Sequence, residues 1–249
     1  MRYLYKLSNE LIFPPLQLSQ SDGLLALGGD LSLDRLLLAY RSGIFPWYND
    51  DSPILWWSPD PRFVLTPSEV IVSSSMKKIL KKNLFSVSLD KNFLAVISNC
   101  KKVRENTGTW ITDEMIEAYC ELHNAGYAHS VEVSKDGELV GGLYGVSIGL
   151  CFFGESMFSL ADNASKTGFI VLSKLLKEKN FELIDCQVYT NHLKSLGAYN
   201  MERDKFVSII AKYTKYETYK DDWNKWLNGR STSDFIAPIG FLGNSNNFT

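Results

Sequence analysis

The stretch from residue 129 to 188 is the part of the sequence that most constrains the fold. It opens with two alternating runs joined around Asp136-Gly137, a dipeptide typical of a hairpin turn. A third strand is predicted over residues 151–158, and a helix with regularly spaced apolar residues follows, beginning at Asn163 or Ser165 and ending at 179. The run F-E-L-I-D-C-Q-V at 181–188 is apolar without alternation, which is typical of a buried strand. A helix between two central strands of a mixed sheet indicates an α+β fold.

The first 62 residues have a different character. A helix is predicted to begin after Ser32, which is a favourable N-cap residue, and to end at Gly43. Four prolines between residues 53 and 67 rule out a long regular element there. We therefore expect a small N-terminal domain over residues 1–62 and a mixed-sheet domain over 63–249.

The composition limits the class of protein. The chain has 249 residues, of which 45% are hydrophobic and 22% charged, and its net charge is −2. This charge gives no global sign of a nucleic-acid partner, so a basic surface for RNA would have to be local. No apolar run approaches the roughly 20 residues of a membrane span, and the first residues show no leader pattern. We expect a cytoplasmic protein, and the spacing of its cysteines and histidines predicts neither a metal site nor a cofactor.

A basic cluster lies in the helix predicted over residues 73–82. It consists of Lys77, Lys78, Lys81 and Lys82, with no acidic residue in the segment. This spacing places all four side chains on one side of the helix. Such a cluster is either a solvated face or a surface that contacts phosphates.

Several tryptophans lie in loops beside glycine or proline. Trp56 and Trp57 are expected to fill the core, whereas Trp47 and Trp110 could equally present a flat ring on which a base stacks. Composition alone does not decide between these alternatives.

One carboxylate, Glu155, interrupts the apolar run C-F-F-G-E-S-M-F. An unpaired buried carboxylate is costly, so its presence indicates a function. Period-two alternation predicts that Asp185 and Gln187 share one face of the strand 181–188, close to Glu155 if the strands are neighbours. The alternative is that Asp185 pairs with a Lys or Arg. Cys186 would point to the opposite face and is disfavoured as a nucleophile.

Together, the motifs resemble the leucyl/phenylalanyl-tRNA–protein transferase family of bacteria. The blocks are G-L-L-A-L-G-G-D-L-S (23–32), Y-R-S-G-I-F-P-W-Y (40–48), L-W-W-S-P-D-P-R (55–62), G-T-W-I-T (108–112), H-S-V-E-V (129–133), L-V-G-G-L-Y-G-V (139–146), G-E-S-M-F-S (154–159), N-A-S-K-T (163–167), L-I-D-C-Q-V (183–188) and S-L-G-A (195–198). The resemblance implies an acetyltransferase-superfamily-like (GNAT-like) second domain. It also implies transfer of Leu or Phe, and Met less well, from aminoacyl-tRNA to proteins with N-terminal Arg or Lys. Such proteins are thereby marked for N-end-rule degradation.

The resemblance also implies roles for individual residues. The family's catalytic positions match Glu155, Asp185 and Gln187. Its contacts to the 3′-adenosine match Trp47 and Trp110, with Tyr40 and Tyr119 as neighbours. Its aminoacyl pocket matches Phe152, Met157, Leu172, Leu176 and Ile184, with Leu143 where methionine is common. Its basic helix for the acceptor stem matches Lys77, Lys78, Lys81 and Lys82.

These matches lead to a hypothesis about the chemistry. Gln187 holds the attacking amine or polarises the ester, and Asp185 orients Gln187 and helps to pass the proton. Glu155 reads the cationic side chain of the acceptor, so we expect it to lack an internal partner. We expect a monomer, and we assign no role to the tail after about residue 220.

Other functions remain open at this point. An acetyl-CoA-dependent N-acetyltransferase would share the fold, but N-A-S-K-T-G is not its glycine-rich pyrophosphate loop. A tRNA-binding module without catalysis would leave the three polar residues unused. A transferase that builds cell-wall peptide bridges would differ in its acceptor.

Overall fold

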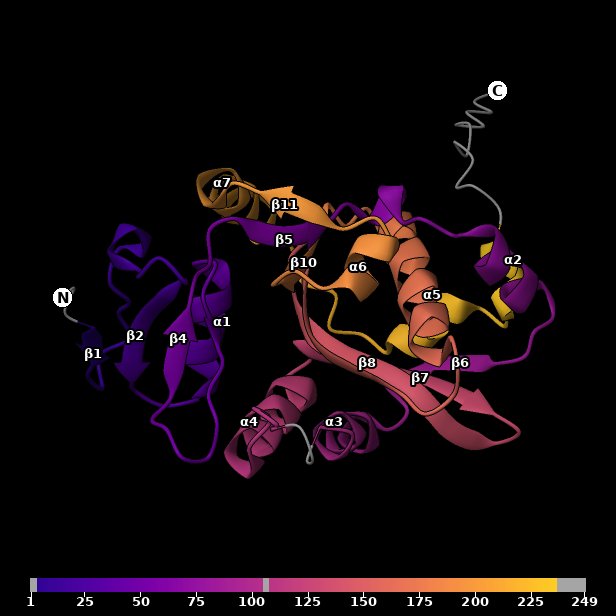
Figure 1. The fold of residues 1–249 in the computed structure, drawn as a ribbon, viewed down its shortest axis with the longest axis horizontal. Helices are drawn as coiled ribbons and strands as arrows, with labels where there is room; N and C mark the ends of the chain where they lie inside the picture. Colours follow the sequence, from indigo (N-terminus) through magenta and orange to yellow (C-terminus); the bar gives the residue numbers. More distant parts are fainter. Residues whose placement is uncertain (1–3, 105–107, 237–249) are drawn as a thin grey trace, which may run out of the picture.

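The computed structural model describes residues 4–104 and 108–236. Two sheets organise the chain, and they lie next to each other along the long axis of the molecule (Figure 1). The predicted boundary near residue 62 falls at the first residue of the second sheet's strand β5. The division into two domains stays a prediction.

The N-terminal sheet has the order β1-β2-β4-β3. Its strands are β1 (Tyr5–Leu7), β2 (Leu24–Gly28), β3 (Phe45–Pro46) and β4 (Leu55–Trp57), and helix α1 (Leu33–Arg41) follows β2. Ser32 takes the N-cap position, although its side chain accepts no hydrogen bond there. Trp56 is 0% exposed, which confirms its core role.

The second sheet has seven strands in the order β11-β5-β10-β9-β8-β7-β6. They are β5 (Arg62–Leu65), β6 (Ser86–Leu89), β7 (Ala128–Lys135), β8 (Glu138–Ile148), β9 (Cys151–Ser159), β10 (Leu183–Gln187) and β11 (Tyr199–Met201). The pair β9 and β10 is parallel, and the other neighbours are antiparallel. A parallel pair needs a long connection, here supplied by α5. The sheet is therefore mixed, which confirms the α+β expectation.

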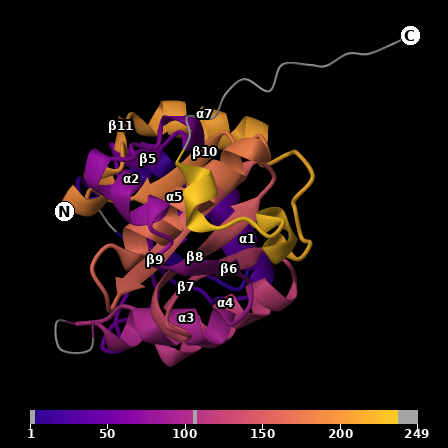
Figure 2. The ribbon, with the colours of Figure 1, turned by 90° about the vertical axis from the view of Figure 1, so that its right-hand side faces the viewer.

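Helices cover both faces of this sheet. They are α2 (Ser74–Lys81), α3 (Phe93–Lys102), α4 (Asp113–Asn124), α5 (Ala164–Glu178), α6 (Asn191–Ser195) and α7 (Arg203–Tyr213). Seen from one end, α3 and α4 lie beneath the sheet and α5 lies above it (Figure 2). Almost all of α5 from Ala164 to Leu176 is buried, so the sheet is enclosed over its centre.

The hairpin turn and the start of the helix over residues 73–82 agree with the sequence predictions, and capping residues begin two of the helices. Asp136 and Gly137 have φ values of 53° and 86°, as a tight turn between twisted strands requires. Thr112 caps α4 by accepting a hydrogen bond from the backbone of Met115 at 3.1 Å. Ser73 does the same for α2. These are local signals, and local signals identified the elements correctly.

The segment after residue 220 packs into the core. Two 3-10 turns, Trp223–Leu227 and Thr232–Phe235, lie in it. Trp223 is 0% exposed and its ring stacks on His129 with centroids 3.8 Å apart. The sequence assigned no role to this tail, whereas its described part stabilises the fold. Residues 237–249 lie outside the described residues.

Candidate active site

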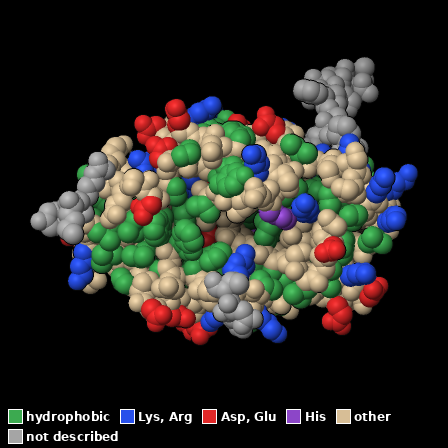
Figure 3. All heavy atoms as spheres, in the orientation of Figure 1, with side chains coloured by type: hydrophobic (Ala, Val, Ile, Leu, Met, Phe, Trp, Pro, Cys, Tyr) green, Lys and Arg blue, Asp and Glu red, His purple; other side chains and the backbone are tan. Residues whose placement is uncertain are grey.

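A cavity of about 330 Å³ opens where the two sheets meet. Its wall combines residues from β3, β8, β9 and β10 with others from α5 and α6. Figure 3 shows the hollow near the centre of one face, with hydrophobic side chains gathered along its left rim. The catalytic residues predicted from the sequence, Glu155, Asp185 and Gln187, all line this cavity.

Two neighbouring strands are irregular where they border the cavity. The pairing of β9 with β8 skips Glu155, and the pairing of β10 with β5 skips Cys186. Gln187 then takes a left-handed φ of 62°, which is uncommon for a residue other than glycine. Bulges re-aim side chains, and here they interrupt the alternation on which the sequence prediction relied.

Glu155 is held by three neutral donors. Its Oε1 accepts hydrogen bonds from the Tyr40 hydroxyl at 2.8 Å and from Gln187 Nε2 at 2.7 Å. Its Oε2 accepts one from the Tyr119 hydroxyl at 2.9 Å, and the two hydroxyls also contact each other. The expectation that Glu155 lacks an internal partner is therefore wrong. Within the described residues, however, it forms no ion pair with a Lys, Arg or His.

The environment of Glu155 places its titration near neutrality. Burial raises its pKa to about 7, although the hydrogen bonds from Tyr40, Tyr119 and Gln187 work in the opposite direction. Burial, and then the charge of Glu155, raises the pKa of Tyr40 and of Tyr119 well above the ordinary value. Both tyrosines consequently remain protonated donors. A carboxylate with a pKa near 7 is suited to accept and return a proton at neutral pH.

Asp185 has a cationic partner that the sequence analysis did not identify. Arg62 donates to its two carboxylate oxygens at 2.8 and 2.7 Å, and both side chains are 1% exposed. The Arg62 guanidinium lies over the rings of Phe45 and Phe206. Asp185 also accepts a hydrogen bond from the backbone N–H of Gln187 at 2.9 Å. The alternative in which Asp185 pairs with a Lys or Arg is thus the observed one.

Two tryptophans form one rim of the cavity. The rings of Trp47 and Trp110 meet edge to face with centroids 5.8 Å apart, and Trp47 is 36% exposed. The ring N–H of Trp57 donates a hydrogen bond to the backbone carbonyl of Trp47 at 2.7 Å and so holds that residue in place. Arg104 holds Trp110, because its guanidinium lies over the Trp110 ring, 4.8 Å from the ring centroid. The same guanidinium donates a hydrogen bond to the backbone carbonyl of Met157. The rim is therefore an aromatic surface whose two rings are held in position by neighbouring side chains.

Comparison with known families identifies the chain. Residues 64–211 match the family model described as "Leucyl/phenylalanyl-tRNA protein transferase", and residues 29–60 match that of its N-terminal domain. The chain belongs to the leucyl/phenylalanyl-tRNA–protein transferase family. By membership it is an aminoacyltransferase, and the matches favour this assignment over the alternatives considered from the sequence.

Relatives with the name of this family match over nearly their whole length. One from Syntrophus aciditrophicus is 57% identical over 220 residues, which are 88% of this chain and 92% of the relative. One from Flavobacterium johnsoniae is 56% identical over 212 residues, which are 84% of this chain and 99% of the relative.

Similarity to solved structures is weak. "The structure of L-PGS from Bacillus licheniformis" aligns with a TM-score of 0.37 and 10% identity, covering 69% of this chain and 55% of that one. A GCN5-related N-acetyltransferase from Kribbella flavida aligns with a TM-score of 0.30 and 9% identity, covering 67% and 60%. These scores are too low to support a relationship, so the GNAT-like description stays a prediction.

Not every position carried over from the leucyl/phenylalanyl-tRNA–protein transferase family borders the cavity. Leu143, Phe152, Met157 and Ile184 line it as predicted. Leu172 and Leu176 do not, because α5 turns them into the core, where each is 0% exposed. The wall instead includes residues that the sequence analysis missed, such as Phe158, Phe169, Val188, His192 and Leu193. Their contact with the cavity depends on tertiary packing and left no local signal.

The two tyrosines predicted beside the adenosine have a different role. Tyr40 and Tyr119 are each 0% exposed, so neither ring presents a face to a base in this structure. They contact Glu155 instead, which corrects their assignment. The basic cluster, which consists of Lys77, Lys78 and Lys81 in α2 and of Lys82 directly after it, is exposed at the end of the molecule labelled α2 in Figure 1, and phosphate binding there stays a prediction.

Metal and membrane features can be stated for residues 4–104 and 108–236. No group of three or more His, Cys, Asp or Glu side chains is arranged there to hold a metal ion. None of the helices in those ranges combines the length and apolar character of a membrane span. Burial raises the pKa of Cys186 well above its ordinary value, so its thiol is a poor nucleophile at neutral pH.

Proposed function

We propose that the protein transfers Leu or Phe, and Met less well, from aminoacyl-tRNA to the α-amino group of proteins that begin with Arg or Lys. The observation that carries the proposal is the composition of one cavity. It combines an apolar floor, a polar wall formed by Glu155 and Gln187, and an aromatic rim formed by Trp47 and Trp110. The three parts of an aminoacyl-tRNA end match these regions in order: the apolar side chain matches the floor, the ester matches the wall, and the adenosine matches the rim.

The apolar floor supports the choice of donor. Leu143, Phe152, Met157 and Ile184 surround the space with hydrocarbon and a thioether. Leu and Phe side chains gain burial energy there, whereas a charged aminoacyl group would lose hydration without a partner. Discrimination between Leu, Phe and Met should be modest, because one methylene is worth about 1–3 kcal/mol.

The charges around the cavity support a cationic acceptor. The carboxylates that line it are Glu155 and Asp185, and Arg62 already neutralises Asp185. The hydrogen-bond donors to Glu155 are all neutral, and Arg104, a cation in the lining, donates to the carbonyls of Cys100 and Met157. The α-ammonium group of the acceptor, together with a following Arg or Lys side chain, is therefore attracted to Glu155.

The reaction needs no covalent enzyme intermediate. The donor ester is already activated, and an α-amine has a pKa of about 7.7–8, so a useful fraction is neutral near pH 7. The amine nitrogen forms a bond to the ester carbonyl carbon, and the bond from that carbon to the ribose oxygen breaks. Glu155 takes the proton from nitrogen and returns it to the departing ribose oxygen. Positioning of the two substrates supplies much of the rate.

Gln187 and Asp185 hold this arrangement in place. Because ionised Glu155 only accepts hydrogen bonds, the Gln187 amide turns Nε2 toward it and Oε1 away. That oxygen is placed to accept an N–H from the attacking amine. Asp185 fixes the unusual backbone of Gln187 and does not itself move the proton, because Arg62 holds both of its oxygens.

The tRNA is recognised mainly at its 3′ end and by its phosphates. Trp47 and Trp110 offer the terminal adenosine a stacking surface, and the lysines of α2 contact the acceptor stem. The sequence of the tRNA body should matter little. On this proposal the enzyme works in the cytoplasm as a monomer, and its products are directed to N-end-rule proteolysis.

A transfer assay tests the reaction and the acceptor group together. Radiolabelled Leu-tRNA is incubated with a peptide that begins with Arg and with the same peptide bearing an acetylated N-terminus. Label should reach only the free-amine peptide and should survive mild RNase treatment. A matched peptide that begins with Glu should remain unlabelled. Label on the acetylated peptide, or on none of the three, would refute the proposal.

A further inference from the structure

A second, smaller cavity adjoins the active site. It measures about 290 Å³ and lies between the end of β9, the first turn of α5 and the start of α6. Three residues, Ser159, Ser165 and His192, line both this cavity and the main one. The two cavities are therefore adjacent, although no role assigned so far uses the smaller one.

The charged side chains of this second cavity, Asp162 and Lys166, form no ion pair with each other. Within the described residues, Lys166 forms no ion pair, and Nε2 of His192 is shielded from solvent without a hydrogen-bond partner. Burial, followed by the charge of Lys166, lowers the pKa of His192, so its ring is neutral at pH 7 and carries one N–H. Asp162 is the acidic residue on the same wall. Lys166 and the His192 ring thus line a cavity whose one carboxylate, that of Asp162, is exposed.

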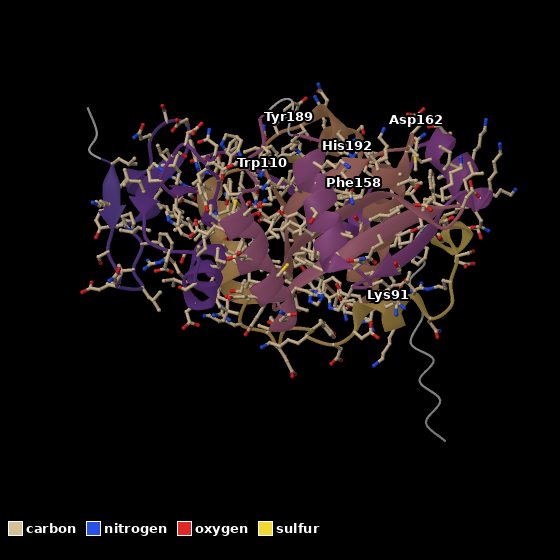
Figure 4. The ribbon with its side chains drawn as sticks, turned by 90° about the horizontal axis from the view of Figure 1, so that it is seen from below. Lys91, Trp110, Phe158, Asp162, Tyr189 and His192 are labelled. Carbon is tan, nitrogen blue, oxygen red and sulfur yellow. The ribbon has the colours of Figure 1, made fainter. Side chains whose placement is uncertain are left out.

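The position of this cavity fits the path of the donor RNA. In Figure 4, Trp110, Tyr189, His192 and Asp162 follow one another from left to right across the view. Helix α2, which together with the adjoining Lys82 carries the four exposed lysines, lies farther to the right in Figure 1. A strand that leads from an adenosine on the tryptophan rim toward α2 would run along the side of the molecule on which His192 lies, and Lys166 lines the same cavity as His192.

We propose that Lys166 and His192 form a subsite for a backbone phosphate of the donor, one of the two nearest its aminoacylated end. This inference rests on the proposed function, because it assumes an aminoacyl-tRNA donor. Lys166 supplies the positive charge, and the neutral His192 ring, in the tautomer that carries its hydrogen on Nδ1, donates a hydrogen bond to a phosphate oxygen. The carboxylate of Asp162 opposes the anion, which limits affinity and helps release of the spent tRNA.

Truncated donors test the subsite independently of the rest of the tRNA. Leucyl-adenosine has no phosphate, leucyl-CpA has one and leucyl-CpCpA has two. Lys166→Gln should raise the KM of the phosphate-bearing donors about tenfold, as expected for one charge-assisted hydrogen bond, and should leave the KM of leucyl-adenosine unchanged. Asp162→Asn should lower the KM of the same phosphate-bearing donors. Lys205→Gln, a change at an exposed lysine on α7, serves as the matched control and should have no effect.

Several results would overturn the subsite. One is that Lys166→Gln raises the KM of leucyl-adenosine as much as that of the phosphate-bearing donors. Another is that it raises the KM of the peptide acceptor alone. The third is that it changes the KM of no donor while its thermal unfolding matches that of wild type. Failure of the proposed function would look different, because wild-type protein would then transfer Leu from none of the three donors and none from intact Leu-tRNA.

Discussion

Arg62 and Asp185 form a bidentate ion pair inside the second sheet, with distances of 2.8 and 2.7 Å and each side chain 1% exposed. The pair joins the first residue of β5 to the strand that carries Gln187. It therefore couples the start of the second sheet to the geometry of the active site.

Breaking this pair should cost much stability. Arg62→Ala leaves the Asp185 charge buried without its partner, and we expect a loss of about 3–5 kcal/mol in the free energy of unfolding. Urea denaturation measures it. The double variant Arg62→Met, Asp185→Asn removes both charges and should recover a large part of that loss. A cost of about 1 kcal/mol or less for Arg62→Ala, as for an exposed pair, would contradict this interpretation.

Glu155 should make the protein less stable as the pH rises. Burial raises its pKa from 4.5 to about 7, so the folded state binds this proton more tightly than the unfolded state does. The contribution of Glu155 to stability therefore falls as the pH rises from the unfolded value toward 7, and then levels off. Glu155→Gln does not titrate, so its stability relative to wild type should increase across that range. Urea denaturation at several pH values checks this, and a difference that is independent of pH would contradict the raised pKa.

The tryptophan rim should contribute to donor binding as a unit. Trp47→Ala and Trp110→Ala should each raise the KM for Leu-tRNA, since one stacking face is worth about 1–3 kcal/mol. The rings contact each other at 5.8 Å between centroids, so the double variant should lose less than the sum of the two single losses. Steady-state kinetics at saturating acceptor measure all three. Unchanged KM values would contradict stacking of the adenosine on these two tryptophans.

The floor of the cavity should set the preference among donors. Leu143→Ala enlarges the space, so it should shift the ratio of kcat/KM toward Phe-tRNA and away from Leu-tRNA by about 1–3 kcal/mol. Leu172→Ala is the matched control, because Leu172 is fully buried away from the cavity. It should cost about 2–5 kcal/mol of stability and leave the donor preference unchanged. A change of donor preference in Leu172→Ala but not in Leu143→Ala would contradict this assignment, because it would indicate that Leu172 contacts the donor and Leu143 does not.

The sequence predicted those parts of the fold that local signals determine. The turn at Asp136-Gly137, the start of α1 after Ser32 and the helical spacing of α5 all depend on neighbours along the chain, and the structure confirms them. The interior position of Trp223 depends on its stacking with His129, about a hundred residues away in the sequence. No pattern among the neighbours of Trp223 in the sequence predicts this contact.

The same distinction applies to the active site. Glu155, Asp185 and Gln187 were identified because polar residues are unusual in apolar strands, and they do line one cavity. Their partners were not identified, because Tyr40, Tyr119 and Arg62 come from distant elements that only the tertiary fold brings together. The bulges at Glu155 and Cys186 also break the alternation that a sequence reading assumes.

The most direct test of the proposed chemistry is the pH dependence of single-turnover transfer from Leu-tRNA to an Arg peptide, in wild type and in Tyr119→Phe. The Tyr119 hydroxyl stabilises ionised Glu155, so its removal should raise the pKa of Glu155 and move the midpoint of the rate profile to higher pH. Tyr144→Phe is the control, because its ring packs against Tyr119 without a hydrogen bond to Glu155. The pKa of the peptide amine is the same in all three proteins. A shifted midpoint in Tyr119→Phe alone supports Glu155 as the proton acceptor, and identical midpoints in all three would contradict it.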